Sequence, residues 1–207
     1  VRSAKQLIRQ GDMFQCVLSQ RFSSDISGNP FDYYRNLRVT NPSNYLYFYD
    51  FEDYQIIGAS PESLVSVKDG IVTTNPIAGT RPRGNDDEED QRLAADLSTD
   101  TKEVAEHRML VDLGRNDIGR IAQIGTVEVT KYMEVEYFRY VMHLTSIVKG
   151  QLLENLTVLD ALKATLPAGT VSGAPKIRAM QRIYELEKEK RGIYAGAIGY
   201  LSATGDM

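Results

Sequence analysis

The chain has 207 residues, 42% of them hydrophobic and 25% charged, which is enough for one large folded domain or two small ones. Its net charge of −4, without any run of Lys or Arg, argues against a nucleic-acid partner. Its one cysteine, Cys16, excludes an internal disulfide and a cluster of thiolate metal ligands. The sequence shows no signal peptide and no apolar run of membrane-spanning length, so we expect no membrane association and a cytoplasmic setting.

Short helices and strands follow one another in the first half of the chain. Residues 14–22, FQCVLSQRF, alternate like a strand, which would place Gln15 and Ser19 on the same side. Residues 75–84, NPIAGTRPRG, are rich in Pro, Gly and Arg and predict a loop. Helices are predicted over residues 3–10, 31–37 and 86–97, and strands within 41–50 and over 55–59, 63–67 and 71–74.

A helix over residues 100–117, DTKEVAEHRMLVDLGRND, opens the second half. Gly114 and Gly119 are expected to interrupt it. A later helix should begin at Pro175 and continue to about residue 190. The residues of that helix expected to face the core are Ile177, Met180, Ile183 and Leu186. The other predicted elements are strands over residues 127–129, 140–148 and 193–202 and a helix over residues 158–165.

Strands and helices come in mixed groups rather than in strict βαβ alternation. The expected class is therefore α+β, with largely antiparallel sheets and helices packed outside. The predicted strand 193–202 enters a turn at residues 204–206 without a following partner, and intact proteins avoid such an exposed edge. We therefore expect a fragment truncated at both ends, which the lack of an initiating Met also favours.

The helix over residues 100–117 carries two acidic residues on one face. Glu103 and Glu106 are three residues apart, so their side chains meet. Two carboxylates at this spacing repel unless a cation or a proton lies between them, and carboxylate oxygens suit Mg²⁺. Two other interpretations remain open: Asp100 with Glu103 also fits a helix-capping pair, and Glu106 also fits an ordinary ion pair.

Two segments are suited to binding an anion. In residues 75–84, Gly79 lets backbone amides approach a ligand closely. In residues 170–176, TVSGAPK, free amides and the helix dipole favour a carboxylate or a phosphate. Each segment also fits a purely structural interpretation, a turn in the first and a well-capped helix start in the second. If both bind, they and the acidic pair predict a small polyanionic substrate bridged through Mg²⁺.

Three other titratable residues lie outside the acidic pair, and each has a possible structural or surface role. His143, on the predicted strand 140–148, fits either a structural residue or a base. Glu62, in the sequence SPES between two predicted strands, fits either a surface acid or a catalytic acid. His107 lies beside Glu106 in sequence but is rotated off its face, so we expect a structural role.

Eight segments, taken together, resemble the chorismate-utilising enzyme family. They are GDMFQCVLSQRF, NPSNYLYFY, ASPES, NPIAGTRPRG, EVAEHRMLVDLGRNDIGR, YVMHLTS, PAGTVSGAPKIRAM and RGIYAGAIGY. They occur in the family's order and cover nearly the whole chain. The resemblance implies an α+β fold of antiparallel sheets packed as a sandwich with helices outside, in which residues 1–207 form part of a chorismate-binding catalytic domain.

The resemblance also implies a reaction that depends on Mg²⁺. Glu106 would hold the metal at the ring carboxylate of chorismate, with Glu103 acting through water. Glu62 matches the family's general acid, which protonates the departing 4-hydroxyl group, and His143 matches a residue implicated in the elimination of pyruvate. The positions that resemble substrate contacts are Gly79, Thr80, Thr170 and Tyr194.

Two positions distinguish branches of the family. Gln15 stands where isochorismate and salicylate synthases carry a water-activating Lys, and a neutral amide cannot be that base. Ala78 stands where aminodeoxychorismate-forming members usually carry a nucleophilic Lys. Both absences point to ammonia adding directly at C2, which gives anthranilate and pyruvate, the first step of tryptophan biosynthesis.

Partners and a regulator also follow from the resemblance. A glutamine amidotransferase subunit would supply ammonia, and L-tryptophan would be a feedback inhibitor. The residues that resemble the tryptophan site are Asn41, Pro42, Ser43, Tyr45 and Leu46, although Asn44 replaces a usual Pro. The alternatives are an aminodeoxychorismate-forming enzyme and a non-catalytic module that binds Mg²⁺ and a carboxylate. Because family residues beyond these segments are absent, we expect the 207-residue chain alone to be inactive.

Overall fold

The computed structural model describes all residues from Val1 to Met207. The chain divides into two compact units, which are described separately. The first unit combines Val1–Ser19 with Leu64–Met207, and the second comprises Gln20–Ser63. No helix in either unit is long and apolar enough to cross a lipid bilayer.

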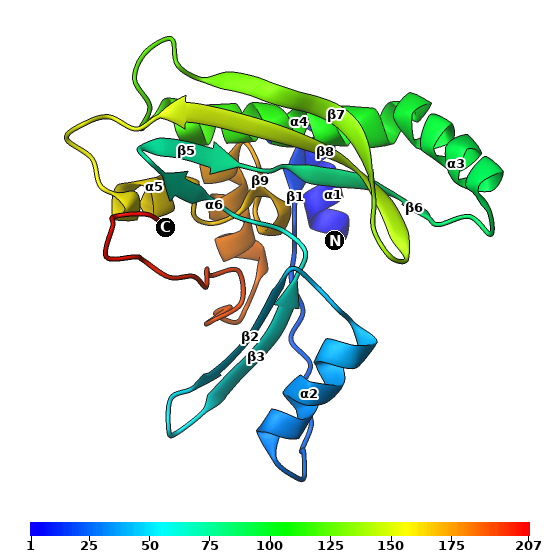
Figure 1. The fold of residues 1–207 in the computed structure, drawn as a ribbon, viewed down its shortest axis with the longest axis vertical. Coiled ribbons are helices and arrows are strands. Elements are labelled where there is room, and N and C mark those ends of the chain that lie inside the picture. Colours follow the sequence, from blue (N-terminus) through cyan, green and yellow to red (C-terminus); the bar gives the residue numbers. More distant parts are fainter. The chain divides into compact units, whose positions relative to one another are not determined.

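A five-stranded antiparallel sheet forms the centre of the first unit (Figure 1). Its central strand is β8 (Val141–Gln151). Along one edge of β8, β5 (Ile71–Thr74) pairs with its C-terminal part and β6 (Ile77–Pro82) pairs with its N-terminal part. The other edge of β8 pairs with β7 (Glu128–Tyr137), and β4 (Ser66–Lys68) pairs with β5. The predicted α+β class with antiparallel sheets is therefore confirmed.

Two consecutive helices pack on this sheet, α3 (Asp87–Thr99) and α4 (Thr101–Gly119). Helix α4 follows the sheet along β5, β6 and β8 (Figure 1). Asp100 caps α4, because its carboxylate accepts hydrogen bonds from the amides of Lys102 and Glu103 at 2.9 and 3.0 Å. The core lies between these helices and the sheet and is built from two apolar clusters, one around Ile118 and Val148 and one around Leu97 and Leu144.

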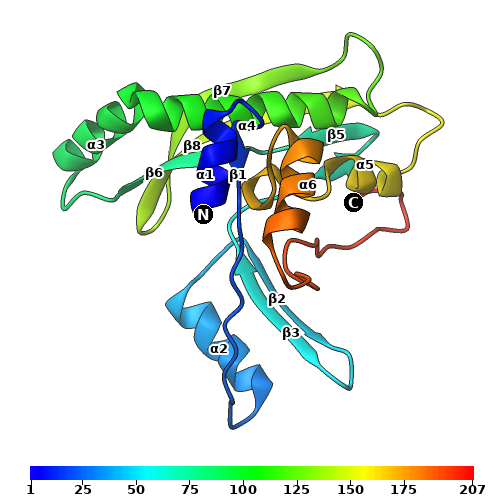
Figure 2. The same cartoon turned by 180° about the vertical axis from the view of Figure 1, so that it is seen from behind.

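The remaining elements of the first unit come from the two ends of the chain. They are α1 (Arg2–Arg9), β1 (Gln15–Cys16), α5 (Val158–Thr165), a 3₁₀ turn at Gly169–Val171, β9 (Gly173–Ala174) and α6 (Lys176–Leu186). Strand β1 pairs with β9 in an antiparallel ribbon, and α1 lies beside α6 (Figure 2). Asp12, just after α1, forms ion pairs with Arg178 and Arg182 of α6 at 2.5 and 2.7 Å.

The second unit is a helix packed on a hairpin. Helix α2 (Pro30–Thr40) lies against β2 (Tyr45–Asp50) and β3 (Gln55–Ser60), which pair antiparallel. Asn29 caps α2 through the amide of Phe31 at 2.9 Å, and the ring centre of Phe31 lies 5.2 Å from that of Phe48. Aromatic contacts therefore hold the helix on the hairpin.

Several predicted boundaries are wrong, each for a physical reason. The strand predicted over residues 14–22 is only Gln15–Cys16, because its partner β9 is two residues long. The loop predicted over residues 75–84 contains β6, because the free edge of β8 pairs with it. The strand predicted over residues 193–202 does not form, and no neighbouring strand lies beside it in the described chain.

The predicted break at Gly114 is wrong, α4 ends at Gly119 as predicted, and part of the predicted core face of α6 is exposed. Helix α4 runs through Gly114, where a Cβ would lie 3.0 Å from Cγ2 of Thr74, so the glycine serves close packing on β5. Helix α6 buries Lys176, Ala179 and Ile183, whereas Ile177 is 69% exposed. Ile183 is therefore a core residue as predicted, whereas Ile177 and the 43% exposed Met180 are not.

Candidate active site

Gly79 forms a β-bulge in β6. The register with β8 shifts between Ala78 and Thr80, and Gly79 has φ +79°, a value that favours glycine. A Cβ at Gly79 would lie 3.3 Å from Leu144 Cδ1 and 3.4 Å from Glu103 Cβ. The bulge therefore brings the backbone of β6 directly against the start of α4.

His143 lies opposite this bulge on β8. Its Nδ1 atom is 3.1 Å from the carbonyl oxygen of Gly79 and 3.1 Å from Oγ1 of Thr80. Because a carbonyl oxygen can only accept, Nδ1 must carry the proton, and in the neutral ring Nε2 is then an unprotonated acceptor. The ring also contacts Phe138 edge to face, with the ring centres 5.3 Å apart. His143 is thus held in an orientation that leaves Nε2 available as a base.

The acidic face of α4 lies between two glycine-containing segments. Positions 103, 106, 110 and 113 share one helix face by their spacing. Glu103 borders Gly79 at one end, and at the other end Leu110 and Leu113 border Gly169, where a Cβ would meet both leucines. Glu106 is therefore positioned between the Gly79 bulge and the turn Gly169–Val171.

The chemistry of this acidic pair fits a hard cation. Glu103 and Glu106 are both half-buried, and Glu106 forms no ion pair. Glu103 lies 3.3 Å from Nζ of Lys102, which is largely exposed. No group of three or more His, Cys, Asp and Glu side chains in the chain is arranged to hold a metal ion. Two carboxylates completed by water and substrate oxygens are nevertheless a usual arrangement for Mg²⁺, so the pair fits that ion.

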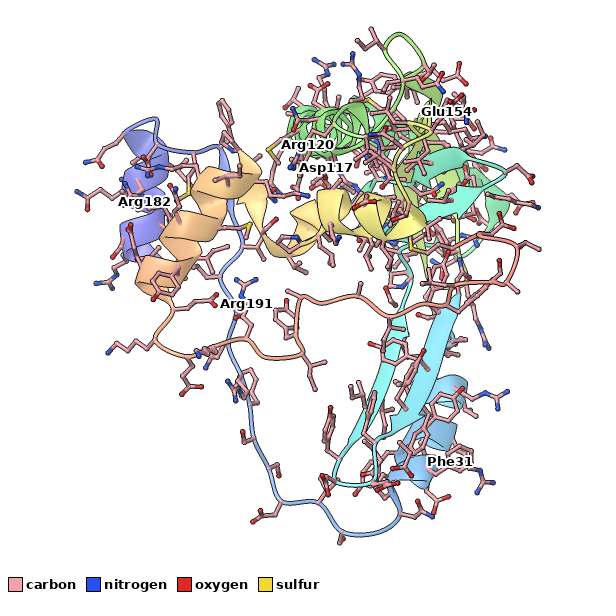
Figure 3. The ribbon with its side chains drawn as sticks, turned by 90° about the vertical axis from the view of Figure 1, so that its left-hand side faces the viewer. Phe31, Asp117, Arg120, Glu154, Arg182 and Arg191 are labelled. Atoms are coloured by element: carbon pink, nitrogen blue, oxygen red, sulfur yellow. The ribbon has the colours of Figure 1, made fainter.

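A buried ion pair fixes the segment that carries Thr170. Nζ of Lys176, the first residue of α6, lies 2.6 Å from Oδ2 of Asp117 on α4 and 2.7 Å from the carbonyl oxygen of Thr165 (Figure 3 labels Asp117). Burial raises the pKa of Asp117, and the hydrogen bond from Lys176 opposes that rise. The turn Gly169–Val171, with Thr170 at its centre, is therefore held between two helices.

Gln15 lies beside the same segment. Strand β1 places Gln15 opposite Ala174 in β9, and the amide of Val17 donates to the carbonyl oxygen of Ser172 at 2.9 Å. The Oε1 atom of Gln15 is buried and accepts no hydrogen bond. A buried acceptor without a protein partner is uncommon. The structure thus brings Gln15 to the TVSGAPK segment, which spacing alone did not predict.

The other predicted site residues lie elsewhere. Tyr194 is 54% exposed, and its ring centre is 5.7 Å from the guanidinium carbon of Arg191. Glu62 belongs to the second unit, where its amide donates to Oγ of Ser60 at 3.3 Å. The tryptophan-site candidates are also in that unit: Asn41, Pro42, Ser43, Tyr45 and Leu46. The roles of Glu62 and of these five residues stay predictions.

His107 has the structural role that its position predicted. It is fully buried, and its Nε2 lies 2.7 Å from Oγ of Ser146, which also accepts from the amide of Met133 at 2.9 Å. Burial lowers the pKa of His107, so the ring is held neutral in the core.

Comparison with known proteins decides the family. The model for chorismate binding enzymes matches residues 1–207. The chain belongs to this family. The chain is 63% identical over 206 residues to anthranilate synthase component 1 of Lactococcus lactis subsp. lactis, and 58% identical over 207 residues to that of Aquifex aeolicus.

Solved structures agree with the family and with the fold. The chain matches anthranilate synthase component I from Streptococcus pneumoniae TIGR4 with a TM-score of 0.91 and 79% identity, over 100% of this chain and 45% of the other. It matches the menaquinone-specific isochorismate synthase from Escherichia coli with a TM-score of 0.58 and 28% identity, over 66% of this chain and 31% of the other. The matches to the Lactococcus lactis and Aquifex aeolicus proteins include 100% of this chain but only 45% and 42% of those proteins. The chain therefore spans less than half of their length.

Proposed function

We propose that the complete protein to which these residues belong is component 1 of an anthranilate synthase. It converts chorismate and ammonia to anthranilate, pyruvate and water, the first reaction of tryptophan biosynthesis. The observation that carries the proposal is the position of Glu106 between two segments. One is the Gly79 bulge, which His143 contacts, and the other is the turn Gly169–Val171, which contains Thr170. Residues 1–207 are then part of the catalytic domain, working in the cytoplasm.

Each residue of the site has a role in this reaction. Glu106, with Glu103 through a water molecule, would hold Mg²⁺, which supplies positive charge opposite the ring carboxylate of chorismate. Gly79 and Thr80 line the substrate at the bulge, and Thr170 contacts it from the far side of Glu106. Tyr194 is proposed as a further substrate contact.

Proton transfers complete the reaction. Glu62 would protonate the 4-hydroxyl group so that it leaves as water, while ammonia forms the new bond at C2. Loss of the C2 proton and of the enolpyruvyl group as pyruvate then restores the aromatic ring. His143 is suited to assist that elimination, because Nε2 is left unprotonated when Nδ1 donates to Gly79.

The nucleophile is ammonia because neither alternative has its catalytic group. Gln15 is neutral and cannot activate water, and Ala78 cannot form a covalent bond to the substrate. A glutamine amidotransferase subunit would supply the ammonia, as the designation component 1 of the relatives suggests. Feedback inhibition by L-tryptophan at residues 41–46 is a further proposal.

The experiment that tests the function uses the full-length protein. Chorismate, Mg²⁺ and ammonium should give fluorescent anthranilate, and L-tryptophan should reduce the rate, whereas residues 1–207 alone should give none. Glu106→Gln should abolish turnover. Asp112→Asn, on the same helix but exposed and paired with Arg115, is the matched control and should leave turnover unchanged. Formation of 4-amino-4-deoxychorismate instead would favour the aminodeoxychorismate-forming alternative, and binding without turnover would favour the non-catalytic module.

A further inference from the structure

Arg191 connects three segments that each carry a residue of the proposed substrate site. Its Nη1 donates to the carbonyl oxygen of Val171 at 2.5 Å, and its Nη2 donates to the carbonyl oxygen of Val17 at 2.7 Å. Its guanidinium carbon lies 5.7 Å from the centre of the Tyr194 ring, within the range of a cation–π contact. Figure 3 labels Arg191 on the segment that follows α6.

Glu187 holds the guanidinium group in this orientation. Nε of Arg191 donates to Oε2 of Glu187 at 2.9 Å and Nη2 donates to Oε1 at 2.7 Å, a bidentate arrangement. The two side chains are only 16% and 12% exposed. The amide of Ser19 also donates to Oε1, at 2.7 Å. The hydrogen bonds from Arg191, followed by those from Ser19, lower the pKa of Glu187 to about 2, so its charge is firmly held.

The contacts of Arg191 fall where regular backbone pairing stops. Strand β1 ends at Cys16, one residue before Val17, and Val171 is the last residue of the 3₁₀ turn that contains Thr170. Beyond these points the two segments have only the Val17–Ser172 hydrogen bond of 2.9 Å between their backbones. Arg191 therefore joins the segment that follows Gln15 to the turn that contains Thr170, at the point where strand pairing no longer holds them together.

We propose that Arg191 is a positioning residue for the substrate. It orients the Thr170 turn, the Gln15 segment and the Tyr194 ring, and contacts no reacting atom itself. The proposal rests on the proposed function, in which Thr170 and Tyr194 contact chorismate and Gln15 stands at the catalytic position that distinguishes ammonia from water as the nucleophile. Because they bind substrate and transition state alike, their displacement should raise KM more than it lowers kcat.

The test compares two arginine variants of the full-length protein. Arg191→Lys keeps the positive charge, but an ammonium group cannot donate to Glu187 and to both carbonyl oxygens in the same geometry. Arg182→Lys is the matched control: its side chain is 21% exposed and pairs with Asp12 and Glu185, and it contacts none of the three substrate segments. We expect the KM for chorismate to rise about tenfold or more in Arg191→Lys, with kcat changed by less than about threefold, and neither to change in Arg182→Lys.

Amide hydrogen exchange of the same full-length variants gives a second readout that does not need turnover. Peptides that cover residues 15–19 and 169–174 should exchange faster in Arg191→Lys than in the wild-type protein, and not in Arg182→Lys. If chorismate is turned over, an unchanged KM in Arg191→Lys overturns the proposal, even if the melting temperature falls. If wild-type protein does not consume chorismate, the proposed function fails, and the exchange rates then test the structural part alone: faster exchange supports the ordering of residues 15–19 and 169–174 by Arg191, and unchanged exchange overturns it.

Discussion

The Nδ1 atom of His143 lies 3.1 Å from the carbonyl oxygen of Gly79. This contact determines which ring nitrogen carries the proton, and it depends on the bulge that Gly79 makes in β6. The left-handed backbone of Gly79 thus determines which tautomer His143 adopts on the neighbouring strand. The predictions that follow concern the contacts on which the site depends.

Gly79→Ala should distort the bulge. A Cβ there would be 3.2 Å from Leu97 Cδ1 and 3.3 Å from Leu144 Cδ1, and φ is +79°. We expect a loss of about 1–3 kcal/mol in the free energy of unfolding, together with a lower kcat from misplacement of His143. Gly119→Ala is the control, because Gly119 ends α4 with no atom within 4 Å of an added Cβ. Equal melting temperatures for the two variants would contradict this account.

His143→Asn should separate the two roles of the imidazole. The Asn amide nitrogen can replace Nδ1 as the donor to Gly79, but nothing replaces Nε2 as an acceptor. The melting temperature should therefore change little while kcat falls by about 10²- to 10⁴-fold, the usual contribution of a general base. Steady-state assay of pyruvate release by the full-length protein measures this. Retention of full kcat would show that Nε2 takes no part in the reaction.

Lys176→Met should be strongly destabilising. It would leave the buried carboxylate of Asp117 without its partner, which typically costs about 3–5 kcal/mol. Lys163→Met is the control, because its ion pair with Asp160 is on the surface and should contribute less than about 1 kcal/mol. The double variant Lys176→Met with Asp117→Leu should recover part of the loss. Urea unfolding measures all three variants, and a similar loss for both lysines would contradict the burial argument.

Lys176 also shows where prediction from sequence stops. Apolar periodicity predicted a core face through Ile177, Met180 and Ile183, but only Ile183 is buried, and Lys176, which pairs with Asp117, is buried instead of Ile177 and Met180. Periodicity counts only apolar residues, so a buried Lys is invisible to it. The boundaries of α2, α3, α4 and α5 were predicted to within a few residues, because capping residues and regular apolar spacing are local signals.

The candidate site was only partly predictable for the same reason. The shared face of Glu103 and Glu106 follows from helix geometry and could be predicted. The approach of Gly79 to Glu103 and the pairing of Gln15 with Ala174 join segments that are far apart in sequence. Local sequence patterns therefore cannot predict these contacts. The resemblance to a family identified Gln15 and Gly79 as candidates, and the structure supplied their neighbours.

The Arg191–Glu187 pair predicts a specific response to acid. Glu187 has a pKa of about 2 in the folded protein, against 4.5 for an ordinary glutamate, because it accepts hydrogen bonds from Arg191. A depressed pKa means that the unfolded state binds the proton more tightly, so the contribution of this group to stability is fully present above pH 4.5. It is lost as the pH falls from 4.5 towards 2.

Glu187→Gln should therefore flatten part of the acid response. The amide cannot titrate, so the variant should have a lower melting temperature than the wild-type protein at pH 7 and a smaller further decrease between pH 4.5 and 2. Calorimetry of the full-length protein across this range provides the comparison. Asp12 has a pKa of about 2 owing to Arg182 and Arg178, so Asp12→Asn should show the same flattening without the rise in KM expected at Arg191. Parallel pH curves for Glu187→Gln and wild type would mean that the pair adds nothing to stability in acid.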